Sequence, residues 1–188
     1  MKPNKKKLCL IFTEGETDQI FYKHLIEFYR KINLKIEHEI VIKNIKGIGN
    51  YRNKLLGCYK NDIMVKYSEY EHYIFLTYDN DVFEYSAKPP INWGKLEKDL
   101  IITGAKGVFH IIADKSIEDW FLIDKESICN SLKIPVLTKH FGNSGFNKIN
   151  SLFKKANKIY TKGKESAEII KKLDIEKIRD KISLQLIK

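Results

Sequence analysis

Residues 7–18 read KLCLIFTEGETD, and this stretch decides the predicted fold. Residues 7–13 form a short apolar run of β-compatible side chains, which predicts a strand. From Ile20 to Ile32 the apolar side chains recur at helical spacing instead. Gly15 lies between the two patterns, and a glycine lets the backbone turn sharply. The stretch therefore predicts a strand, a tight turn and a helix.

Alternating strand and helix patterns continue along the chain. Three further apolar runs predict strands, over residues 37–44, 72–78 and 107–113. Helical spacing predicts helices over residues 51–67, 93–102, from about residue 117, and 166–186, with a loop-broken helix in 141–164. Strands that alternate with helices favour a mainly parallel sheet covered by helices. We expect an α/β, Rossmann-like fold with four strands.

The length of the chain suggests one domain. A protein of 188 residues with 43% hydrophobic content can bury one sizeable core. We find no internal repeat and no low-complexity linker that would mark a domain boundary. The prediction is a single domain over residues 1–188, with a core at about 7–132 and a helical extension at about 133–188.

The cysteines and the apolar runs indicate the compartment. Cys9, Cys58 and Cys129 are widely spaced and form no CxxC or Cys/His pattern, so neither a disulfide framework nor a zinc site is predicted. The apolar run at residues 8–12 is too short for a signal-peptide core, and no later run approaches membrane-spanning length. We expect a cytoplasmic protein that does not enter a membrane.

Positive charge gathers in the C-terminal part of the chain. Residues 133–188 hold 14 Lys and Arg against 5 Asp and Glu, whereas residues 1–132 are nearly balanced, with 20 against 19. Such a segment can attract a polyanion, because Lys and Arg release counterions from nucleic-acid phosphates. The alternative is a solvated face that keeps the protein in solution.

Acidic residues follow three of the four predicted strands. The first strand ends in Glu14-Gly15-Glu16-Thr17-Asp18, the third in Asp79-Asn80-Asp81, and the fourth leads to Ser116-Ile117-Glu118. The carboxyl ends of parallel strands share one edge of a sheet, where ligands bind. Carboxylates gathered there repel one another unless a cation is bound. Ligands of oxygen alone favour Mg²⁺ or Mn²⁺ over zinc.

The spacing of these residues suits a metal site. Asp79 and Asp81 point the same way if the chain is still extended. Gly15 would let Asp18 return over the site, and Ser116 flanks a helix start whose N–H groups favour phosphate. Each acid alone also has an ordinary reading, as a polar turn or a favourable first-turn charge. We predict a metal site because acids follow three separate strands at the same edge of the sheet.

At these residues the chain resembles the Toprim fold, and most of all the nuclease branch of OLD-family and RloB-like proteins. The resemblance covers about residues 7–125 and rests on Glu14-Gly15 with Asp18, on Asp79-Asn80-Asp81 and on Ser116-Ile117-Glu118. The run Glu118-Asp119-Trp120-Phe121-Leu122 is similar to the helix start of such proteins. Many relatives have Glu where this chain has Asp18.

The resemblance implies a metal-dependent endonuclease that cuts DNA or RNA, often in antiviral defence. It implies one Mg²⁺ or Mn²⁺ on Glu14, Asp79 and Asp81 and a second near Asp18 and Glu118, with Glu14 alternatively acting as a general acid or base. It also implies a lysine from the C-terminal part near the site. Lys162 is the best local match, with Lys148 and Lys164 as rivals.

Several alternatives stay open. The chain is also similar in size to Toprim ribonucleases that process structural RNA. The alternative that is not an enzyme is a non-catalytic Toprim module that binds nucleic acid or a partner protein. No GxxxxGK[ST] occurs, so an ATP-driven activity would need a separate ATPase subunit. The sequence leaves open whether the chain forms a homodimer. For nucleic-acid binding we single out five lysines: Lys148, Lys154, Lys155, Lys158 and Lys164.

Overall fold

The computed structural model describes residues 6–33, 38–80 and 91–186, except for the side chains of residues 164, 165 and 183–186. The chain forms two compact units. We call residues 1–15 and 33–112 the sheet unit, and residues 16–32 and 113–188 the helical unit. Helix α1 (Glu16–Ile32) belongs to the helical unit because it packs against helix α9 (Ala167–Ile170). That residues 1–188 form a single domain stays a prediction.

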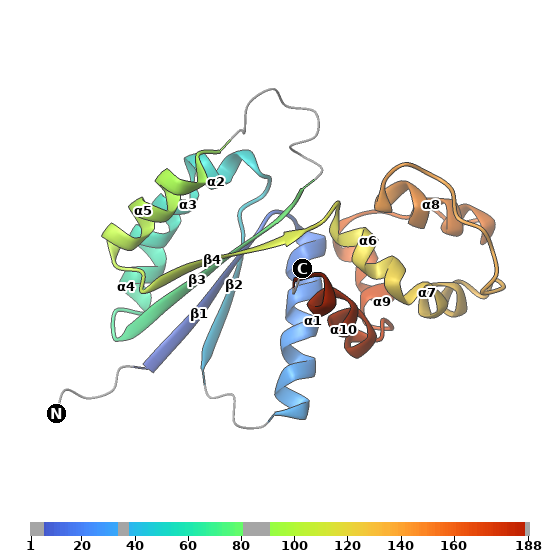
Figure 1. The fold of residues 1–188 in the computed structure, drawn as a ribbon, viewed down its shortest axis with the longest axis horizontal. Helices are drawn as coiled ribbons and strands as arrows, with labels where there is room; N and C mark the ends of the chain where they lie inside the picture. The colour runs from blue at the N-terminus through green and yellow to red at the C-terminus, as the bar shows by residue number, and fades with distance from the viewer. Residues whose placement is uncertain (1–5, 34–37, 81–90, 187–188) are drawn as a thin grey trace. The chain divides into compact units, whose positions relative to one another are not determined.

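The sheet unit is built on a four-stranded parallel sheet (Figure 1). Its strands are β1 (Lys6–Thr13), β2 (Glu39–Asn44), β3 (Tyr70–Asp79) and β4 (Gly107–Ala113), in the spatial order β2-β1-β3-β4. Thr13 of β1 pairs with Asn44 on one side and with Thr77 on the other. The expected parallel α/β fold, consistent with a Rossmann-like arrangement, is confirmed.

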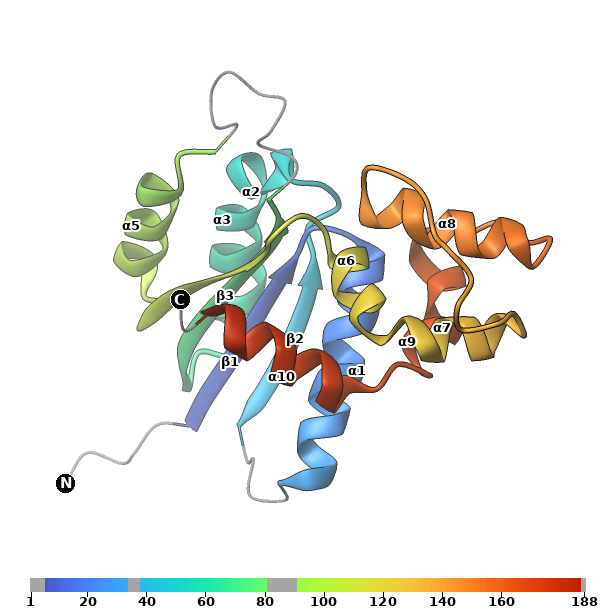
Figure 2. The same cartoon turned by 45° about the vertical axis from the view of Figure 1, so that its right-hand side comes forward.

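The core of the sheet unit lies between the sheet and a layer of helices. Side chains of a strand alternate between its two faces. On one face of the sheet Leu8, Leu10, Phe12, Ile74 and Leu76 are all 0% exposed. Figures 1 and 2 show helices along that side. They are α2 (Gly49–Asn53), α3 (Leu55–Cys58), α4 (Met64–Lys66) and α5 (Trp93–Thr103).

The prediction of one continuous helix over residues 51–67 is wrong. The chain forms α2, α3 and α4 there, with a π-helical turn, η1 (Tyr59–Ile63), between α3 and α4. Tyr59 is 0% exposed within this turn, and its hydroxyl lies 3.1 Å from Nδ1 of His72 on β3. Packing of Tyr59 against β3 therefore contributes to the π-helical turn, which helical spacing in the sequence does not predict.

The helical unit contains short helices around α1. After β4 come α6 (Ile117–Phe121), the 3₁₀ turn η3 (Leu122–Asp124), α7 (Lys125–Leu132), α8 (Gly145–Lys155), the 3₁₀ turn η4 (Gly163–Ser166), α9 and α10 (Ile175–Leu186). The ring of Phe21 on α1 packs against the rings of Trp120 and Phe121, at centroid distances of 6.1 and 5.4 Å. These apolar contacts join α1 to α6.

The helix expected over residues 166–186 is divided, and the division has a tertiary cause. The carboxylate of Asp124, 2% exposed, accepts hydrogen bonds from the backbone N–H of Asp174 at 2.8 Å and from Nζ of Lys177 at 3.2 Å. Asp174 in turn accepts from the N–H of Lys177 at 3.0 Å, which caps α10. Asp174 thus begins a new helix instead of continuing α9.

No described helix has the length and apolar composition that a membrane span requires.

Candidate functional site

Two of the expected acids lie at neighbouring strand ends of the sheet unit. Glu14 follows β1 directly, and Asp79 is the last residue of β3. Because Thr13 is paired with Thr77, Glu14 follows at the level of Tyr78, one residue before Asp79. The strand order reverses between β1 and β3, since β2 lies on one side of β1 and β3 on the other. In open parallel sheets this switch point is where ligands bind.

Tyr51 links the ends of these two strands. Its side chain is 0% exposed, and its hydroxyl lies 2.9 Å from the carbonyl oxygen of Phe12 and 2.5 Å from that of Thr77. The hydroxyl of Thr77 also donates to the Phe12 carbonyl, at 3.2 Å. These buried hydrogen bonds hold the backbones just before Glu14 and Asp79 at a fixed separation, so the position of both carboxylates depends on the helix layer.

A tight turn after β2 supports the backbone of Glu14. The N–H of Gly47 donates to the carbonyl oxygen of Glu14 at 2.7 Å, and Gly47 has φ of 108°. This φ is in the region that favours glycine over other residues. Gly47 therefore supports Glu14 through the backbone. Asp81, the other acid expected here, lies outside the described residues.

The helical unit brings a second group of expected residues together. Asp18 lies in the first turn of α1 and is 8% exposed, and Glu118 lies in the first turn of α6 and is 0% exposed. Ser116 occupies the N-cap position of α6, and its hydroxyl donates to Oδ2 of Asp119 at 2.9 Å. Ser116 therefore supports the start of the helix that carries Glu118.

The segment before and within η4 lies next to these acids. Nζ of Lys162 is 3.2 Å from Oε1 of Glu118, and the N–H of Gly163 donates to the hydroxyl of Thr17 at 2.8 Å. Gly163 has φ of 85°, and a Cβ there would lie 2.7 Å from Oε2 of Glu16. Both observations explain a glycine at this position. Of the two weighed lysines whose side chains the structure describes, Lys162 is paired with Glu118 and Lys148 with Asp119.

Sequence reasoning missed Tyr160 as a member of this group. Tyr160 is 2% exposed, and its ring packs against Phe146 and Phe153. Burial raises the pKa of its hydroxyl far above the ordinary value, and the negative charge of Glu118 raises it further. The phenol therefore keeps its proton beside the carboxylates. The run Tyr160-Thr161-Lys162-Gly163 was the available signal, but burial of the ring cannot be read from it.

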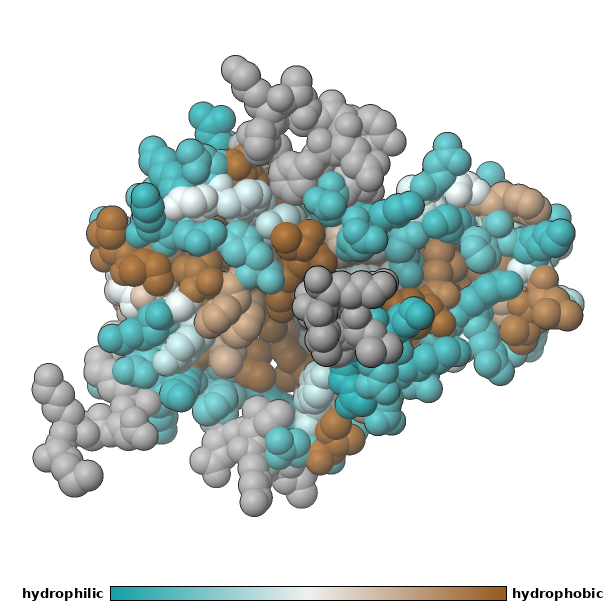
Figure 3. All heavy atoms as spheres, viewed as in Figure 1, coloured by the Kyte–Doolittle hydropathy of each residue, from teal (hydrophilic) through white to brown (hydrophobic). Residues whose placement is uncertain are grey.

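The expected nucleic-acid-binding lysines have different environments. Lys148 is half-buried, and its Nζ lies 3.0 Å from Oδ1 of Asp119, so it stabilises the start of α6. Lys154 and Lys155 are exposed in the last turn of α8. The visible surface of the helical unit is mostly hydrophilic (Figure 3). The side chain of Lys164 is not among those that the structure describes.

The sequence spacing of Lys154, Lys155 and Lys158 predicts that all three lie on one helix, and this prediction is wrong for Lys158. Helix α8 ends at Lys155, Asn157 has φ of 54°, and the N–H of Lys158 returns to the carbonyl of Phe153 at 2.9 Å. A left-handed residue with such a backward hydrogen bond is a common way to end a helix. Lys158 is exposed, but it lies beyond the helix.

The acids of both units offer carboxylate oxygens of the kind that Mg²⁺ and Mn²⁺ prefer. Glu118 is fully buried, and among described residues its one ion pair is with Lys162, whose side chain is 53% exposed. Burying the Glu118 carboxylate costs free energy, and the half-exposed ammonium of Lys162 compensates its charge. Within the described ranges, however, no three of His, Cys, Asp and Glu are grouped as a metal ion would need.

No protein-family model, no curated protein and no solved structure matches this chain.

Proposed function

We propose that the chain is a divalent-metal-dependent nuclease of the Toprim type, which hydrolyses phosphodiester bonds of DNA or RNA. The observation that carries the proposal is the pair of carboxylates at the switch point of the parallel sheet. Glu14 and Asp79 follow the adjacent strands β1 and β3, whose ends Tyr51 holds together. Acids in this position are suited to bind a cation and, through it, an anionic substrate.

The helical unit supports the same chemistry independently. Its buried acids Asp18 and Glu118 lie at two helix starts, with the ammonium of Lys162 beside Glu118. Burying a carboxylate costs free energy unless its charge is compensated. Binding a cation at the two acids and a phosphate at Lys162 would explain why all three side chains lie at this place.

We assign the residues as follows. Glu14 and Asp79 of the sheet unit, together with Asp81 as expected from the sequence, would hold one Mg²⁺ or Mn²⁺, and Asp18 and Glu118 of the helical unit would hold a second. Such an ion would stabilise negative charge that develops on the oxygens of a phosphoryl group. Lys162 offsets negative charge on the phosphate. Tyr160 keeps its proton, because burial and the negative charge of Glu118 both raise the pKa of its hydroxyl.

The test is incubation of the purified full chain with supercoiled plasmid DNA, single-stranded DNA and total tRNA, each with Mg²⁺, Mn²⁺ or EDTA. We expect cleavage of at least one substrate with a metal ion and none with EDTA. Glu14→Gln and Asp79→Asn should reduce cleavage to the level seen with EDTA. Glu118→Gln should do the same through the helical unit.

Glu69→Gln is the matched control, because Glu69 is an exposed acid next to the opposite end of β3. It should cut as the parent does. Cleavage that persists in EDTA, or a Glu14→Gln protein as active as the parent, would contradict the assignment. If none of the three substrates is cut with either ion, the protein is not the nuclease proposed here.

A further inference from the structure

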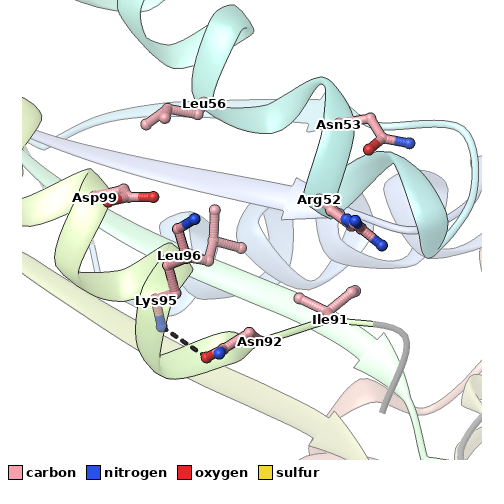
Figure 4. A pocket seen from close by; sticks show the side chains of 8 residues that line it. All are labelled: Arg52, Asn53, Leu56, Ile91, Asn92, Lys95, Leu96 and Asp99. Atoms are coloured by element: carbon pink, nitrogen blue, oxygen red, sulfur yellow. Dashed lines mark hydrogen bonds between the residues drawn. The ribbon is translucent and has the colours of Figure 1, made fainter. Parts of the chain in front are cut away.

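A cavity of about 450 Å³ lies in the sheet unit between α2, α3 and α5 (Figure 4). Arg52 and Leu56 line it from α2 and α3, and Lys95, Leu96 and Asp99 from α5, with Ile91 just before that helix. Its volume is within the range of about 300–1,000 Å³ that small-molecule sites occupy. The proposed metal chemistry uses none of these side chains.

Two cationic side chains make the cavity favourable for an anion. Arg52 and Lys95 both line it, and neither forms an ion pair with another residue of the described ranges. Lys95 is in the first turn of α5, where Asn92 caps the helix by accepting from the Lys95 N–H at 3.0 Å. The amino end of a helix carries partial positive charge. Two exposed cationic side chains and a helix start therefore line the same cavity, and each of the three favours an anion.

The rest of the cavity differs in chemistry. Ile91 and Leu96, 2% and 7% exposed, and the half-buried Leu56 give it an apolar surface. Asp99 lies one helical turn beyond Lys95, and Figure 4 shows it at the opposite end of the cavity from Arg52. From Asn92 to Asp99 the helix extends about 10 Å at about 1.5 Å per residue. A carboxylate there accepts hydrogen bonds but donates none.

We propose that this cavity binds one nucleotide. Its phosphate interacts with Arg52, Lys95 and the amino end of α5. Its base lies on the apolar surface of Leu56 and Leu96, with an amino group of the base donating to Asp99. An inorganic anion would use the first part of this site alone, whereas a nucleotide uses all of it.

The nucleotide has two sources, a free mononucleotide or one unit of a nucleic-acid strand. In either case the inference concerns binding and does not depend on the proposed cleavage. It is measured in EDTA, where the proposed nuclease is inactive. Failure of one proposal therefore leaves the other standing.

The experiment is isothermal titration calorimetry of the full chain, at fixed salt with EDTA. The probes are the four ribonucleoside 5′-monophosphates, inorganic phosphate and a single-stranded hexanucleotide. Arg52→Ala with Lys95→Ala should weaken nucleotide binding at least about tenfold. The control, Lys54→Ala with Lys98→Ala, removes two exposed cations from the same region that do not line the cavity. It changes the net charge equally and should bind as the parent does.

Binding of mononucleotides supports the free source, and binding of the hexanucleotide alone supports a unit of a strand. Asp99→Asn, which adds a donor in place of an acceptor oxygen, should change the preference among the four bases. The proposal is overturned if no nucleotide or hexanucleotide binds at millimolar concentration. It is also overturned if inorganic phosphate binds as tightly as every nucleotide, or if both double variants weaken binding equally.

Discussion

Replacing Lys162 with methionine should destabilise the helical unit measurably. Lys162→Met removes the ammonium 3.2 Å from Oε1 of Glu118 and keeps an apolar stem. Removing one partner of a fully buried ion pair costs about 3–5 kcal/mol, whereas an exposed pair contributes about 0.2–1 kcal/mol. Glu118 is 0% exposed but Lys162 is 53% exposed, so water screens this pair in part. We expect a loss of about 1–2 kcal/mol, between the two limits.

A double-mutant cycle isolates the contribution of the pair. The parent, Lys162→Met, Glu118→Gln and the double variant are unfolded with urea in EDTA, and circular dichroism follows the transition. In the double variant no buried charge is left without its partner, so its loss should be smaller than the sum of the two single losses. The coupling free energy should be about 1–2 kcal/mol.

Lys158→Met provides the control for loss of a surface ammonium, because Lys158 is exposed nearby in the sequence. Its effect should stay within about 0.5 kcal/mol. A coupling free energy near zero, with Lys162→Met no more destabilising than Lys158→Met, would refute the reasoning. Glu118 would then not depend on Lys162 for compensation of its charge.

Three further predictions concern other parts of the molecule. Tyr51→Phe removes a hydroxyl that contacts two buried carbonyls, and urea unfolding should show that the free energy of unfolding falls by about 1–3 kcal/mol. The control is Tyr70→Phe at the start of β3, where the tyrosine is half-buried; an equal loss for the two variants would contradict the role of Tyr51 in linking the ends of β1 and β3. Millimolar Mg²⁺ or Mn²⁺ should raise the melting temperature, since a ligand at about a hundred times its Kd contributes about 2.7 kcal/mol; an unchanged temperature argues against a metal site. Changing Lys154, Lys155 and Lys158 to Ala should weaken nucleic-acid binding, and the slope of its salt dependence should fall by about one unit for each lost phosphate contact. If the slope is unchanged, these lysines form a solvated surface that does not contact phosphate.

The strands could be predicted from the sequence because their signals are local. β4 has the expected bounds, Gly107–Ala113, and β1 and β3 exceed the predicted ranges by one or two residues at an end. Each is an apolar run that ends at a turn residue or an acid, and such a run needs no distant partner to be recognised. The positions of Glu14 and Asp79 at strand ends follow directly from these bounds.

The helices were harder to predict, because distant contacts divide them. The amide of Asp174 donates to Asp124, fifty residues earlier, and α10 begins there. The helical spacing of residues 166–186 does not predict that hydrogen bond. Likewise, the end of α8 before Lys158 depends on a left-handed Asn157, a conformation that residue type permits but does not require.

By itself the sequence determined a parallel α/β sheet and the acids that follow its strands, because hydrophobic periodicity and strand ends are properties of neighbouring residues. Only the tertiary structure decided that Tyr51 joins the ends of β1 and β3, that Lys162 rather than Lys148 pairs with Glu118, and that Tyr160 is buried beside it. The reason is physical. These relations depend on which side chains share a buried space, and residues far apart in the chain enter that space only when the helices have packed.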